Sequence, residues 1–282
     1  MSCKTFAVHL IKHKKQAQIR VDDGSTARSL ARVSRYVREV AKPFFYQSLV
    51  IAGLGQLSEL ASRLEHTPHH LRRIRHLFLS DWTHDQANQR VVSTSDADMD
   101  RYDLENATAA RILTLAAPTL ETLTVISSCP FTSTPLIGHI FSTPLPHLLE
   151  LALSGYYRSP TREGALEAAC PSLTHLRISG LASAASFADE LREAATPADG
   201  PPSKFPARFP PRLRELVLEP RQLLLPPVKR SPFHLMHEKM LNSLRELAES
   251  PSGRGVRVVV LEKERAEDLY HEMLGRWLER LI

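Results

Sequence analysis

Apolar residues recur along this chain in a short pattern: one apolar residue, a second three positions later, and a third two positions after that. Copies occupy 74–79, 120–125, 148–153, 173–178 and 213–218, and a proline lies just upstream of the last four. Side chains two apart in a strand share a face, so each copy predicts a short strand that buries its last two apolar residues together. One such unit cannot bury its apolar face alone, so the copies are expected to stack.

Apolar residues spaced three and four apart predict helices between and beyond these strands. The predicted helices cover 25–42, 54–65 and 103–116, a helix that opens at Ser231-Pro232, and a last helix from Ala266 to Leu281. The β-branched run Val256–Leu261 predicts a final buried strand. The polar segments 81–103 and 196–212 are expected to be loops.

The order of these elements predicts an α/β fold. Successive strand anchors, from Leu77 to Leu216, are separated by 46, 28, 25 and 40 residues, and two of these intervals fall in the 20–29 range of leucine-rich repeats. Strands that alternate with helices pair in parallel through right-handed crossovers. We therefore predict an irregular leucine-rich-repeat-like solenoid arc with parallel strands, whose exposed end is covered by the last strand and helix.

The alternation within each strand also predicts which side chains face outward. The candidate partner-binding face comprises Phe78, Thr122, Thr124, Glu150, His175, Arg177, Glu215 and Val217. This mixture of small, aliphatic and charged side chains suits a protein or peptide partner better than a phosphate backbone, which would require stacked lysines and arginines. The alternative interpretation is a face that is solvated or covered by the chain's own loops.

Composition narrows the class of protein. Of the 282 residues 43% are apolar, which argues against wholesale disorder. The net charge of +5 is too small to indicate nucleic-acid binding. Three scattered cysteines predict reduced thiols in an intracellular protein, cytoplasmic or nuclear. No apolar run reaches the length of a membrane span, so no membrane partner is expected.

Candidate chemistry is sparse. The spacing Asp96-x-Asp98-x-Asp100 suggests a calcium loop, but arginine and alanine stand where an EF-hand requires glycine and glutamate. The histidines between His66 and His84 have neither cysteines nor the paired spacing of a zinc site. No nucleophile elbow, phosphate loop, dinucleotide fingerprint or metalloprotease motif occurs. We therefore expect no metal, no cofactor and no catalytic residues.

One segment of the chain resembles a known family. The residues from Leu30 to Leu49, LARVSRYVREVAKPFFYQSL, resemble the second half of an F-box, and the helix and strands that follow look like the F-box and leucine-rich-repeat-like proteins of fungi. By this resemblance the adaptor-binding residues are Leu30, Val33, Ser34, Arg35, Val37, Arg38, Pro43, Phe45 and Tyr46. The Leu-Pro-x-Glu helix that usually begins an F-box does not precede Asp22.

The resemblance implies a division of the chain and a function. Residues 1–24 stay unassigned, 25–50 form a partial F-box-like helical segment, and 51–282 form the repeat-like α/β domain with its terminal strand and helix. The implied function is substrate recognition in a cullin–RING ubiquitin ligase, with a ligase adaptor and a protein target as partners. Two alternatives stay open: an interaction protein whose degenerate F-box no longer joins a ligase, and an enzyme with an unrecognised site.

Overall fold

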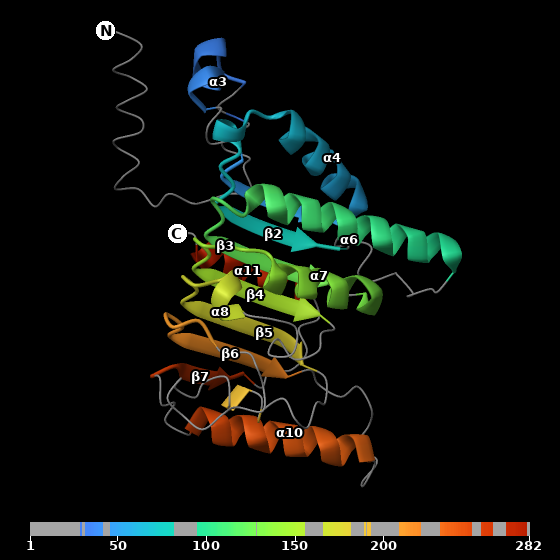
Figure 1. Ribbon diagram of the computed structural model, residues 1–282, viewed down its shortest axis with the longest axis vertical. Helices are drawn as coiled ribbons and strands as arrows, with labels where there is room; N and C mark the ends of the chain where they lie inside the picture. The colour runs from blue at the N-terminus through green and yellow to red at the C-terminus, as the bar shows by residue number, and fades with distance from the viewer. Residues whose placement is uncertain are drawn as a thin grey trace.

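Seven parallel strands form the centre of the molecule (Figure 1). The computed structural model describes residues 29, 32–41, 46–81, 95–127, 129–155, 166–181, 189, 191–192, 209–220, 232–249, 255–261 and 269–280. The strands are β1 (Ser48–Ala52), β2 (His76–Ser80), β3 (Thr122–Ser127), β4 (Glu150–Gly155), β5 (His175–Leu181), β6 (Glu215–Pro220) and β7 (Arg257–Val260). Each strand pairs in parallel with its predecessor in the sequence, which confirms the predicted α/β class with parallel strands.

The recurring apolar pattern sets the register of the sheet. Its second apolar residue lies in one row across neighbouring strands, formed by Leu77, Leu123, Leu151, Leu176 and Leu216. Leu49 and Val258 continue the row into β1 and β7. Strand β1 was not predicted, although its Tyr46, Leu49 and Ile51 have the same spacing, because the first position carries an aromatic residue instead of an aliphatic one.

Helices cover one face of this sheet. They are α4 (Gly53–His66), α6 (Asp96–Ala116), α7 (Pro130–Ser142), α8 (Leu166–Ala169) and α10 (Pro232–Glu249), with the short 3-10 helix η2 (His69–Leu71) before β2. Their apolar side chains and the inward rows of the strands make one continuous core. Helix α10 packs along β7 at the end of the sheet and buries Met240, Leu244 and Leu247. Met236 was predicted to belong to the same apolar stripe, but it is exposed. No helix in the described ranges has the length and apolar character needed to cross a membrane.

Helix α11 (Leu269–Arg280) lies on the opposite face of the sheet, behind β3 and β4 in the view of Figure 1. Its Met273 and Trp277 pack on Phe78 of β2 and Ile126 of β3, in a cluster separate from the main core. The sequence-based expectation that this helix covers the end of the arc is therefore wrong. The amphipathic stripe was real, but periodicity alone does not say which apolar surface a helix covers.

Two segments differ from the predicted helices because of local capping. Helix α6 begins at Asp96, seven residues before the predicted start, since the Ser95 hydroxyl accepts a hydrogen bond from the Asp98 amide and the acidic first turn suits the helix dipole. The predicted helix over 25–42 is interrupted by a turn at Arg32–Val33. Ser34 then starts α3 (Arg35–Ala41), because its Oγ accepts a hydrogen bond from the Val37 amide at 3.1 Å.

Candidate protein-binding surfaces

The predicted outward side chains lie in rows on one face of the sheet, here called the open face. The first row consists of Thr122, Glu150, His175 and Glu215 on neighbouring strands. The second row consists of Phe78, Thr124, Ala152, Arg177 and Val217. The face is not uniformly accessible. Phe78 is fully buried and Thr124 and Val217 nearly so, while Thr122, Glu150, His175, Arg177 and Glu215 are half-buried.

Helix α11 accounts for the burial of Phe78. The Phe78 ring makes edge-to-face contacts with Tyr270 at a centroid distance of 5.5 Å and with Trp277 at 6.0 Å. Such aromatic pairs contribute about 0.5–1.5 kcal/mol beyond the burial of their area. A cleft runs beside the helix, between Trp277, Arg276 and Arg280 on one side and Thr124 and Glu150 on the other.

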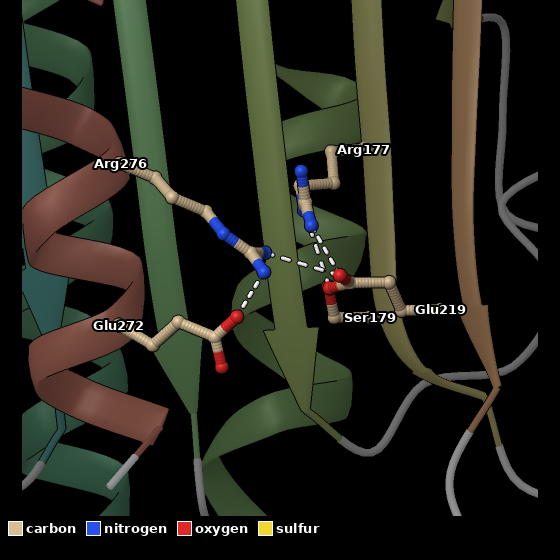
Figure 2. A network of polar contacts seen from close by, with 5 residues as sticks. All are labelled: Arg177, Ser179, Glu219, Glu272 and Arg276. Carbon is tan, nitrogen blue, oxygen red and sulfur yellow. Dashed lines mark hydrogen bonds and ion pairs between the residues drawn. The ribbon is translucent and has the colours of Figure 1, made fainter. Parts of the chain in front are cut away.

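A charged network joins α11 to the far strands of the open face (Figure 2). Glu219 on β6 accepts hydrogen bonds from Arg177 on β5 and from Ser179 Oγ, the latter at 2.5 Å. Arg276 on α11 donates to the same carboxylate at 3.0 Å and also pairs with Glu272 one turn earlier on the helix. Further along α11, Arg280 Nη1 donates to Glu150 Oε2 of β4 at 2.9 Å.

The ionisation of Glu219 follows from this environment. Burial on its own would raise the pKa of the Glu219 carboxyl, but hydrogen bonds from Arg177 and Ser179 and the charges of Arg177 and Arg276 outweigh it and lower the pKa below the ordinary value. Glu219 is therefore a carboxylate that needs cationic partners on the open face. His76, at the edge of the same face, has its pKa lowered mainly by burial, and its Nδ1 lies 3.1 Å from Thr122 Oγ1.

A second buried polar group joins the carboxyl ends of β2 and β3 to α7. Asp81 Oδ2 accepts hydrogen bonds from the Cys129 amide at 3.0 Å, from Thr132 Oγ1 at 3.0 Å and from Ser127 Oγ at 3.2 Å. The Cys129 amide precedes the first residue of α7, so Asp81 caps this helix from a neighbouring strand. All three donors to Asp81 Oδ2 belong to β3 and to the start of α7, so Asp81 has a structural role in joining these elements.

The F-box-like residues lie apart from the sheet. Val33, Tyr36 and Val40 are exposed by 71%, 47% and 41%, and Val37 is half-buried. Ser34 is the N-cap of α3, and Arg35 and Arg38 are exposed on it. Tyr46 instead packs against the main core beside β1. The predicted sites Leu30, Pro43 and Phe45 lie outside the described residues.

The residues considered for metal or thiol chemistry do not assemble a site in the described ranges. No group of three or more histidine, cysteine, aspartate or glutamate side chains there could hold a metal ion. Asp96, Asp98 and Asp100 lie in the first turns of α6, and His84 lies outside the described residues. Cys129 and Cys170 are buried free thiols, and burial raises the pKa of Cys170 to about 12, which keeps it protonated and unreactive.

Sequence reasoning missed the α11 residues of the open face. The apolar residues from Ala266 to Leu281, Met273 and Trp277 among them, predicted a helix with an apolar stripe, but Arg276 and Arg280 were not part of that prediction. The two arginines border that stripe, and their carboxylate partners stand at outward strand positions, Glu219 and Glu150. This charge complementarity was the available signal that the helix covers the open face.

Comparisons of the chain with models of protein families, with curated proteins and with solved structures find no match. The geometry of the open face and of α3 is therefore the basis for the functional argument.

Proposed function

We propose that this chain is a non-catalytic protein-binding subunit that recognises a target for a cullin–RING ubiquitin ligase of the F-box type. The observation that carries the proposal is the exposed apolar side of α3, directly ahead of the parallel sheet. On this proposal α3 contacts the ligase adaptor, and the leucine-rich-repeat-like arc holds the target. The chain would act by raising the concentration of the target beside the ubiquitin-loading enzyme.

The surface of α3 supports the adaptor contact. Tyr36 and Val40 are four residues apart in α3, so they lie on one side of the helix, and the exposed Val33 lies in the turn just before it. None of these three belongs to an apolar cluster of the described chain. Exposed apolar groups that are contiguous in this way are typical of a surface that another protein covers.

The sheet supports the target-binding role. Its strands follow one another in sequence order, so each added strand extends the open face sideways, and the polar groups on that face come from five consecutive strands, β2 to β6. Extended faces of this kind are the binding surfaces of stacked repeat proteins. The chemistry of the face, with carboxylates, arginines and aromatic groups together, suits a protein partner.

A second candidate function keeps the binding role without the ligase. Within the described residues of the F-box-like segment, the longest helix is α3, Arg35–Ala41. The sequence also lacks, ahead of Asp22, the Leu-Pro-x-Glu helix that usually begins an F-box. An interaction protein with a degenerate F-box would retain the open face and lose the adaptor.

Adaptor binding by the purified full chain tests the first proposal against the second. The double variant Val33→Asp/Tyr36→Asp places two charges on the exposed apolar side of α3, and Ser58→Asp, an exposed position on α4, is the matched control. Burying an unpaired charge costs several kcal/mol, so affinity for the adaptor should fall more than about tenfold in the double variant and stay unchanged in the control. A chain that does not bind the adaptor at all would contradict the ligase proposal and favour the second candidate.

A further inference from the structure

Helix α11 identifies what the open face accepts. The face receives two apolar anchors four residues apart, Met273 and Trp277, which pack against Phe78 and Ile126. It also receives two arginines four residues apart, which pair with Glu219 and Glu150. The surface therefore selects an amphipathic helix with a methionine and an aromatic anchor along one side and arginines beside them.

Two features indicate that α11 binds the open face weakly. Gly275 stands in the middle of the helix, where glycine disfavours helical structure, although a Cβ at this position would meet no heavy atom within 4 Å. The indole Nε1 of Trp277 is buried and has no hydrogen-bond acceptor among the described residues. A buried N–H group without an acceptor weakens the binding of α11 to the open face. A helix that provides an acceptor for this group, or that has no such group, would not carry this cost.

We propose that the open face over β2–β6 binds an amphipathic helix of a partner protein, and that α11 is a resident competitor which the partner helix displaces. This inference rests on the proposed function, in which the open face holds the target, and it names the chemistry of that target. The partner helix carries apolar anchors at the Met273 and Trp277 spacing and basic side chains that take the places of Arg276 and Arg280. Until it binds, α11 shields Phe78 and Ile126 from solvent.

The test uses the full chain and a fluorescein-labelled synthetic peptide of residues 269–280 as the partner helix, with binding measured by fluorescence anisotropy. Because the apparent affinity scales with the fraction of chains whose face is open, Trp277→Ala in the chain should tighten peptide binding by at least about tenfold. Gly275→Ala, which strengthens the resident helix, should weaken it by about fivefold. Glu279→Ala, at an exposed position of the same helix, is the matched control and should leave binding unchanged.

A charge exchange supplies a readout in which any change in the stability of α11 cancels, because two peptides are compared on the same chain. In the chain variant Glu150→Arg, the peptide with Arg280→Glu should bind better than the native peptide, and in the native chain the order should reverse. A peptide that binds all chains equally, or that fails to bind even Trp277→Ala and Glu150→Arg, would overturn the proposal. Since the adaptor takes no part in this assay, such a failure is separate from any failure of the α3 contact.

Discussion

The helix-covered face of the sheet buries a continuous core that runs from Ile51 in β1 to Val256 beside β7, whereas on the open face α11 makes a smaller apolar cluster, whose buried members are Phe78, Ile126, Met273 and Trp277. Fully burying a large apolar side chain contributes about 1.5–3 kcal/mol. In the described chain the first face therefore supplies most of the apolar burial, and the second supplies a smaller share. The proposed exchange of α11 for a partner helix relies on this difference, because the main core contains no residue of α11.

The largest expected effect lies on the helix-covered face. Leu151 lies in β4, the central strand of the sheet, and is 1% exposed, so Leu151→Ala should lower the free energy of unfolding by about 2–5 kcal/mol through lost burial and a residual cavity. Ala152, the next residue on the same strand, faces outward, and Ala152→Ser should change it by less than about 1 kcal/mol. Urea denaturation measures both values. Equal losses in the two variants would show that the faces do not differ as described.

The polar link between β2, β3 and α7 should have the next largest effect. Asp81→Ala removes the acceptor of the buried Cys129 amide and one partner of each buried hydroxyl, and this should cost about 1–3 kcal/mol of unfolding free energy. The Ser127 and Thr132 hydroxyls keep their contact with each other, and Thr132 Oγ1 keeps the Cys129 carbonyl. Asp81→Asn keeps an acceptor oxygen and should retain most of the stability. Thermal denaturation of the two variants side by side checks this, and an Asn variant as unstable as the Ala variant would contradict the assigned contacts.

The charged network of the open face predicts a pH dependence. The folded protein lowers the pKa of Glu219 below the ordinary glutamate value of 4.5, so the ionised Glu219 carboxylate stabilises the fold above pH 4.5. This stabilisation is lost as the pH falls from 4.5 through the pKa of Glu219 in the folded protein. Glu219→Gln should therefore be less stable than the native chain by about 1–2 kcal/mol at pH 7. Urea titrations of both proteins at pH 7 and pH 3 measure the gap, which should narrow at the lower pH. A gap that is constant with pH would argue against an ionised Glu219 in the network.

The same contrast explains what the sequence could predict. The inward row of leucines and the helix-covered core follow from a local apolar pattern, so strands β2 to β6 and their register were predictable from Leu77, Leu123 and the residues that align with them. The position of α11 depends on contacts between residues far apart in the chain, such as Arg280 with Glu150, and no local periodicity encodes them. Asp81 was missed for the same reason, since its partners belong to the next strand and helix.

The smallest expected effect separates the two arginines of α11. Among the described residues Arg280 makes one ion pair, with Glu150, and its side chain is 38% exposed, whereas Arg276 is 22% exposed and pairs with both Glu219 and Glu272. Exposed single ion pairs contribute about 0–1 kcal/mol, so Arg280→Ala should leave the free energy of unfolding within that range of the native value. Arg276→Ala should cost more, because it removes a cation from a half-buried carboxylate. Urea denaturation in low and in high salt checks this ranking. The loss of unfolding free energy in Arg280→Ala should vanish in high salt, and the loss in Arg276→Ala should persist. If salt reduced both losses equally, Arg276 would lie in solvent instead of in the network.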